Sequence, residues 1–183
     1  TGVQTCALPI CATKGEIAVI AAAKALQDEL LGPPSPSADE ALPLGEERRA
    51  VDSFRKASLM VLGLAMQQYR EKLSEQQEVL MHLADMLIDT YAADSVVLRA
   101  SAAVHDRLPN ADRHADAARV FVSDAALRIE ASARQALAAM LEGDTLRTMV
   151  AALRRLFRQM PVNTALLRRQ LADATVIKGG YIF

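Results

Sequence analysis

Two cysteines near the start of the chain raise the question of a redox or metal pair. Cys6 and Cys11 are separated by four residues. A metal site built on such a pair needs further cysteine or histidine ligands, and the neighbouring sequence supplies none. We therefore expect neither redox chemistry nor metal binding from these cysteines.

The first ten residues, TGVQTCALPI, have an explanation outside protein chemistry. The DNA ACTGGAGTTCAGACGTGTGCTCTTCCGATCT, the end of a widely used short-read sequencing adapter, translates in frame to the same ten residues. Its last base, T, begins both cysteine codons, which places Cys11 at the junction. We interpret residues 1–11 as an adapter artefact and junction, and we expect the rest to be a fragment of a gene that continues upstream.

The histidines and a pair of acids are the next candidates for chemistry. His82, His105 and His114 lack a second ligand at i+4 and the spacing of a zinc-protease motif, so we interpret them as surface or packing residues. Asp85 and Asp89 lie one helical turn apart and could serve metal or acid/base chemistry. Because no Glu-x-x-His partner exists on another helix, we expect salt bridges instead. We assign no catalytic, cofactor-binding or metal-binding residue.

One charge pattern favours binding. Six arginines and no acidic residue lie between Arg147 and Arg169. Apolar residues occupy one face of the predicted helix, whereas the other carries four candidate contacts for an anionic surface: Arg147, Arg154, Arg155 and Arg158. Each basic residue near an anionic membrane contributes about 1 kcal/mol. The alternative is an ordinary solvated face whose acidic partners come from a neighbouring element.

The elements that position these residues are predicted to be helices. Ala, Leu, Arg, Glu and Gln predominate, and all are good helix formers. The apolar periodicity predicts helices over 14–31, 46–73, 75–104, 111–141 and 145–160, with a short sixth starting near Asn163, and an irregular tail after it. The four prolines of segment 32–45 indicate a linker.

The predicted fold class is all-α. We expect an up-down bundle of about four long helices, with residues 46–183 as the bundle domain, an N-terminal helix within 12–31 and a short C-terminal helix. Two apolar stripes on the third helix predict that it is central. Ser74 with Gln77 fits a capping box, and Asn110 is a predicted N-cap.

Overall charge and hydropathy exclude two classes. The net charge of −1 argues against a general nucleic-acid binder. The longest apolar runs reach about ten residues, well short of the roughly 20 that a membrane-spanning helix requires.

Three segments together resemble a known family. The run LSEQQEVLMHLADMLIDTYAADSVVLRAS at 73–101 resembles the C-terminal region of the very-long-chain-type acyl-CoA dehydrogenases of bacteria. KGEIAVIAAAKALQDELL at 14–31 resembles the segment after the catalytic domain in that family, and EGDTLRTMVAALRRLFRQMPVNTALLRRQLAD at 142–173 resembles its closing segment. The resemblance covers residues 12–183 in order.

The resemblance implies a division of labour. The parent enzyme would use FAD to take a hydride from the β-carbon of a fatty acyl-CoA, while a glutamate removes the α-proton and trans-2-enoyl-CoA is formed. The catalytic glutamate and the residues that contact the flavin would lie upstream, so we expect this fragment to bind no FAD and to be inactive alone. Its expected roles are docking on the dehydrogenase body, assembly in a homodimeric parent and peripheral contact with the membrane. The expected location is the cytoplasm or the inner face of the membrane.

A second function of a different class stays open at this point. Ala-rich amphipathic helices also occur in stand-alone proteins that coat lipid or polymer granules, as phasins do. The upstream DNA distinguishes the two. A reading frame that continues into a flavin-binding body favours the dehydrogenase, and a start codon just before residue 12 favours the coating protein.

Overall fold

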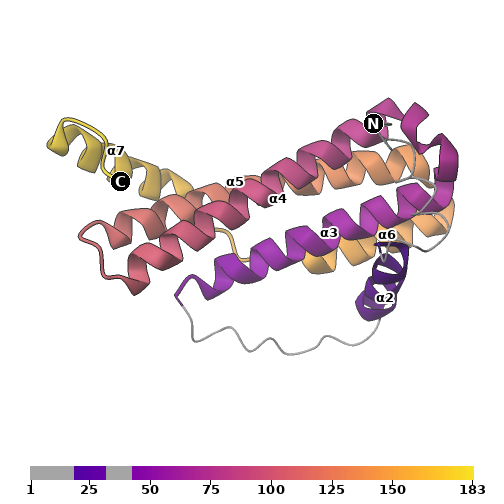
Figure 1. Ribbon diagram of the computed structural model, residues 1–183, viewed down its shortest axis with the longest axis horizontal. Helices are drawn as coiled ribbons and strands as arrows, with labels where there is room; N and C mark the ends of the chain where they lie inside the picture. The colour runs from indigo at the N-terminus through magenta and orange to yellow at the C-terminus, as the bar shows by residue number, and fades with distance from the viewer. Residues whose placement is uncertain (1–18, 32–42) are drawn as a thin grey trace, which may run out of the picture.

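The computed structural model describes residues 19–31 and 43–183 (Figure 1). Within these ranges every regular element is a helix, which confirms the all-α prediction. The predicted junction 1–11, the start of the predicted first helix and most of the predicted linker lie outside the described residues.

Three long helices and one shorter helix form the bundle. α3 (Gly45–Tyr69), α4 (Gln77–His105) and α5 (Ala111–Met140) run antiparallel in succession. α6 (Gly143–Leu156) then returns along α3 and α5 (Figure 1). The order is therefore the predicted up-down order, although α6 has 14 residues, about half the length of its neighbours.

Two further helices pack at opposite ends of the bundle (Figure 1). α2 (Val19–Leu31) lies on α3 and α6, where Ala23 is fully buried and Glu29 pairs with Lys56 at 2.7 Å. α7 (Thr164–Lys178) packs on α5. The helix that the sequence placed before the linker is thus in contact with the bundle that follows it.

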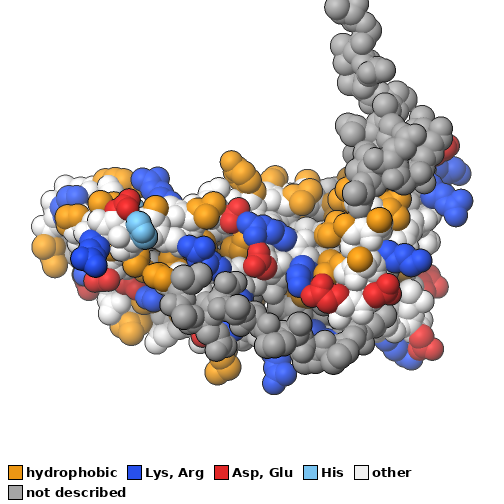
Figure 2. All heavy atoms as spheres, turned by 60° about the horizontal axis from the view of Figure 1, so that its bottom comes forward, with side chains coloured by type: hydrophobic (Ala, Val, Ile, Leu, Met, Phe, Trp, Pro, Cys, Tyr) orange, Lys and Arg blue, Asp and Glu red, His pale blue; other side chains and the backbone are white. Residues whose placement is uncertain are grey.

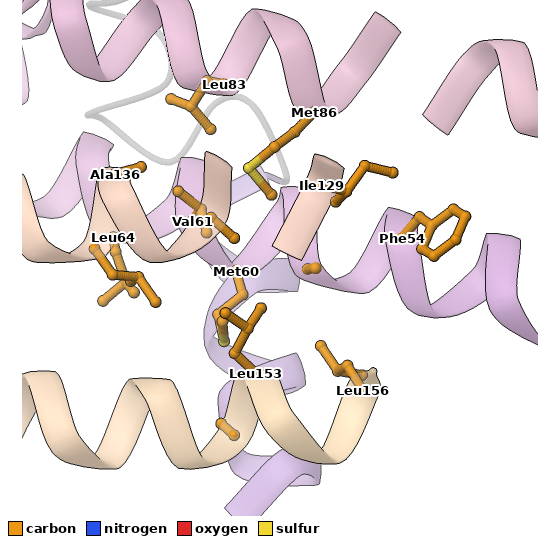
Figure 3. Close-up of a cluster of buried hydrophobic side chains, with 14 of the residues drawn as sticks. Phe54, Met60, Val61, Leu64, Leu83, Met86, Ile129, Ala136, Leu153 and Leu156 are labelled. Atoms are coloured by element: carbon orange, nitrogen blue, oxygen red, sulfur yellow. The ribbon is translucent and has the colours of Figure 1, made fainter. Parts of the chain in front are cut away.

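The core lies where α3, α4, α5 and α6 meet (Figure 3). Burying each large apolar side chain contributes about 1.5–3 kcal/mol, so this cluster is the main stabilising feature of the bundle. Phe54 also stacks on Phe157, with 5.7 Å between the ring centroids. The largest side chains with less than 2% exposure are Phe54, Met60, Met86, Ile129, Leu137, Leu153, Val51 and Val61.

The turn between α3 and α4 differs from the prediction. α3 ends at Tyr69, and residues 70–75 form a 3₁₀ helix, η2 (Arg70–Glu75), so the predicted helix to residue 73 is too long. Ser74 lies inside η2 and cannot be an N-cap. The predicted capping box is wrong, because the Gln77 side chain donates to the Ser74 carbonyl at 3.0 Å.

The end of the chain is irregular, as predicted, but it packs against the bundle. Residues after α7 have no regular structure, but they fold back onto the start of α5. Ile182 is 5% exposed, and the Phe183 ring lies 5.0 Å from the His114 ring. Asn110 occupies the N-cap position of α5, as predicted, but its side chain makes no capping hydrogen bond; its amide donates instead to the Ile182 carbonyl at 2.6 Å. Asn163, by contrast, caps α7 by accepting from the Leu166 amide.

Candidate interaction surfaces

The amphipathic character of α6 places the predicted arginines at the surface. Its apolar face is buried in the core through Met149, Ala152, Leu153 and Leu156. The other face is left to solvent, where all four predicted contact residues lie: Arg147, Arg154, Arg155 and Arg158. Arg158 follows the helix, which ends two residues before it.

The four arginines are not equivalent. Arg147 pairs with Asp144 at 2.9 Å, but both side chains are more than 80% exposed, so the pair contributes little. Arg155 also has a partner. Arg154 and Arg158 have no ion pair within the described ranges. A membrane or an acidic partner would meet these two with the smallest loss of existing contacts.

A groove of about 1040 Å³ lies between α3, α5 and the segment that joins α6 to α7. Arg155 and Arg158 line it, whereas Arg147 and Arg154 do not, so only part of the predicted stripe borders the groove. Charges of both signs surround the groove and are interspersed over the face shown in Figure 2. Its acidic residues are Glu46, Glu47, Asp52, Asp124 and Glu130.

Of the acid pair on α4, Asp89 forms a salt bridge and Asp85 does not. Asp89 accepts two hydrogen bonds from Arg128, at 2.9 and 2.7 Å, which confirms the salt-bridge interpretation for this residue. The hydrogen bonds with Asp89 raise the pKa of Arg128, against the lowering effect of burial. Asp85 has no ion pair in the part of the chain that the structure describes.

The histidines for which contacts are seen have different partners. His105 is within 3.0 Å of Asp106 at the exposed end of α4, and His114 contacts the ring of Phe183. Among the described residues no group of histidine, cysteine and carboxylate side chains could hold a metal ion. None of the described helices combines the length and apolar character that crossing a bilayer requires.

One surface was misread from the sequence. The two apolar stripes of α4 predicted a central helix, but only one stripe is buried. On the other, Leu87, Tyr91 and Leu98 are 49%, 77% and 55% exposed. Within the described part of the chain, α4 contacts only α3, α5 and η2. The signal was present in the sequence as two interleaved apolar repeats, but the sequence could not show which repeat the bundle covers.

The comparisons with known proteins agree with the fold. Residues 53–155, more than half of the chain, match the family model described as acyl-CoA dehydrogenase, C-terminal domain. A probable acyl-CoA dehydrogenase of Bacillus subtilis is 37% identical over 166 residues, which is 88% of this chain and 27% of that protein.

A solved structure of an acyl-CoA dehydrogenase contains a region with the same fold. The crystal structure of an acyl-CoA dehydrogenase from Bacillus anthracis, complexed with FAD, superposes with a TM-score of 0.85 and 33% identity. The match covers 94% of this chain and 29% of that chain. The chain therefore spans less than a third of the length of these relatives.

Proposed function

The chain belongs to the family of acyl-CoA dehydrogenase C-terminal domains, and we propose that it is the closing helical domain of a longer FAD-dependent acyl-CoA dehydrogenase. The longer protein would oxidise a fatty acyl-CoA to a trans-2-enoyl-CoA, the first step of fatty-acid β-oxidation. The observation that carries the proposal is the match to 94% of this chain but 29% of an FAD-complexed relative.

Within that enzyme, this domain would supply assembly rather than chemistry. A pyrophosphate in the groove would meet the carboxylates of Glu46, Glu47 and Asp124 among its cations, which supports a flavin site elsewhere in the longer protein. The sequence also has no glycine-rich phosphate loop followed by a helix. We therefore place the flavin and the catalytic base in the remaining part of the longer protein.

The proposed physical role is to cover and hold the dehydrogenase body. A bundle with its own buried core is a stiff unit, and its uncovered apolar surface favours packing against another domain. Assembly into a homodimer is proposed for the longer protein, not for this domain alone. The comparisons give no support to a stand-alone granule-coating protein, because the relatives they identify are dehydrogenases.

A direct test uses the chain by itself. The purified chain is mixed with FAD and then with palmitoyl-CoA and an electron acceptor. We expect no flavin in the protein fraction after gel filtration and no reduction of the acceptor. Retained flavin, or acceptor reduction that depends on palmitoyl-CoA, would place chemistry in this domain and contradict the proposed division.

Contact with an anionic membrane is a narrower proposal that rests on the arginines. Arg154 and Arg158 carry most of it, because they have no ion pair within the described ranges. In a flotation assay with phosphatidylglycerol vesicles, replacing both with Glu should reduce binding more than Arg147→Glu does. Equal binding by the wild type and the double variant would end the lipid proposal and leave the dehydrogenase assignment intact. The corresponding location is the cytoplasm, at the inner face of the membrane.

A further inference from the structure

α4 carries two apolar seams on opposite faces. The inner seam repeats every three or four residues from Val79 to Ala100 and is buried against α3 and α5. The second seam, which we call the outer seam, follows the same alternation on the far side of the helix. Its members are all exposed: Met81, Ala84, Ile88, Tyr91, Ser95, Leu98 and Ala102.

The outer seam is mainly apolar, with Ser95 as its one small polar residue. Met81, Ile88, Tyr91 and Leu98 are between 54% and 77% exposed. It carries two hydroxyl groups: that of Ser95 already donates to the Tyr91 carbonyl at 2.9 Å, and that of Tyr91 can stay in water at the tip of an otherwise apolar ring. A continuous exposed stripe of this kind marks an interaction surface rather than scattered surface residues.

The spacing of the outer seam specifies the shape of its partner. Alternating steps of three and four residues place the side chains for packing along another helix at a small crossing angle. From Met81 to Ala102 the seam is roughly 30 Å long. A partner helix of about five to six turns would cover it.

The borders of the seam specify the charge of that partner. Asp85 and Arg99 flank the seam on the same side, and neither has an ion pair within the described ranges. A helix packed here would therefore be favoured by a basic side chain opposite Asp85 and an acidic one opposite Arg99. A membrane surface would favour basic residues on both sides instead.

We infer that the outer seam of α4 is the surface on which a helix of the dehydrogenase body packs. This inference rests on the proposed function. The matched relatives carry about 70% of their length outside the region that this chain covers, so the partner would be supplied within the same polypeptide. On one side of α3, the helices α2 and α6 cover the bundle. α4 lies on the opposite side, and no described helix covers its outer face (Figure 1).

Thiol accessibility tests the inference. In the B. subtilis relative, the matched C-terminal region is replaced with residues 12–183 of this chain, with either Ser95→Cys or Ala102→Cys on the seam. The matched control is Ala151→Cys, which is exposed on α6. Labelling by N-ethylmaleimide is followed at each site by peptide mass spectrometry, in the full-length hybrid and in the isolated chain.

Burial of the seam should slow labelling of both seam cysteines by at least about tenfold in the hybrid, while the control changes little. Equal labelling in the two proteins, in a hybrid that retains FAD and oxidises acyl-CoA, would overturn the inference but leave the proposed function standing. A hybrid that folds with this domain in place yet neither holds FAD nor oxidises acyl-CoA would count against the proposed function itself.

Two further outcomes identify other occupants and would also overturn the inference. Labelling that slows in the isolated chain as its concentration rises indicates a second copy. Labelling that slows only with phosphatidylglycerol vesicles indicates lipid. If the hybrid does not fold, the isolated cysteine variants are mixed with the relative lacking its C-terminal region. Slowing confined to the seam supports the inference, and its absence contradicts it.

Discussion

The β-carbon of Ala23 lies only 2.2 Å from the position that a β-carbon would take at Gly63. This approach brings the backbones of α2 and α3 together, and Ala23 is fully buried by it. Gly63 is therefore required by packing, even though glycine in the middle of a helix costs about 1 kcal/mol relative to alanine.

Replacing Gly63 with Ala should displace α2 from the bundle. The added methyl group cannot fit beside the Ala23 backbone and side chain, so the contact must open. We expect a net destabilisation of about 1–3 kcal/mol in chemical unfolding, with faster proteolysis within residues 19–31.

The matched control removes the clash and keeps the substitution. In a chain that begins at residue 43, Gly63→Ala should be neutral or stabilising by up to about 1 kcal/mol, because only helix propensity remains. The same loss of stability in both chains would show that the contact with Ala23 is not the cause.

Two residues on α5 test the position of the core. Ile129 is fully buried, whereas Leu127, two residues earlier, is 69% exposed. Ile129→Ala should reduce the free energy of unfolding by about 2–5 kcal/mol through the cavity it leaves. Leu127→Ala should change it by less than about 0.5 kcal/mol. Similar losses for the two variants would mean that α5 is rotated from the orientation described.

The fold could be predicted from the sequence because its signals are local. Apolar residues at helical spacing, and breaks such as Pro109 and the Glu142–Asp144 turn, are enough to define the antiparallel order. The predicted start of the last helix near Asn163 is confirmed for the same reason, since the Asn163 side chain accepts from the Leu166 amide only three residues away.

Features that depend on distant partners could not be predicted. Asn110 lies at the predicted N-cap position, yet its side chain bonds the Ile182 carbonyl near the end of the chain, 72 residues away. The exposure of Tyr91 depends on which helices surround α4. The two apolar faces of α4 look alike in the sequence, so the exposed one could not be identified. The arginines are similar: their exposure was predictable, but the partner of Arg147 and the groove beside Arg158 were not.

The hydrogen bond from Asn110 should hold the C-terminal tail, residues 179–183, against the bundle. Asn110→Ala removes the hydrogen bond to Ile182, so residues 179–183 should exchange their amide hydrogens faster, with a loss of about 0.5–1.5 kcal/mol. Asn163→Ala is the matched control, because it removes a cap and should speed exchange at the start of α7 instead. Unchanged exchange of the tail in Asn110→Ala would exclude this anchoring role.

The ion pair between Asp89 and Arg128 should contribute little to the free energy of unfolding. Titration of Arg128 should not change that contribution near neutral pH. Arg128 is half exposed, so a double-mutant cycle with alanine at both sites should give a coupling of about 1 kcal/mol or less. Hydrogen bonds with Asp89 raise the pKa of Arg128, so the charge is present throughout the neutral range and its contribution is lost only as pH rises through the raised folded-state pKa. A coupling above about 3 kcal/mol would mean that the pair is buried in solution.

The most direct measurement of the assembly role is the temperature at which flavin is released. Three proteins are compared: the intact B. subtilis relative, the same protein without its C-terminal region, and the hybrid that carries residues 12–183 of this chain. Flavin fluorescence reports release on heating. We expect the truncated protein to release FAD at a lower temperature and the hybrid to recover most of the difference. A hybrid that releases FAD at the same temperature as the truncated protein would contradict the claim that this domain holds a dehydrogenase body together.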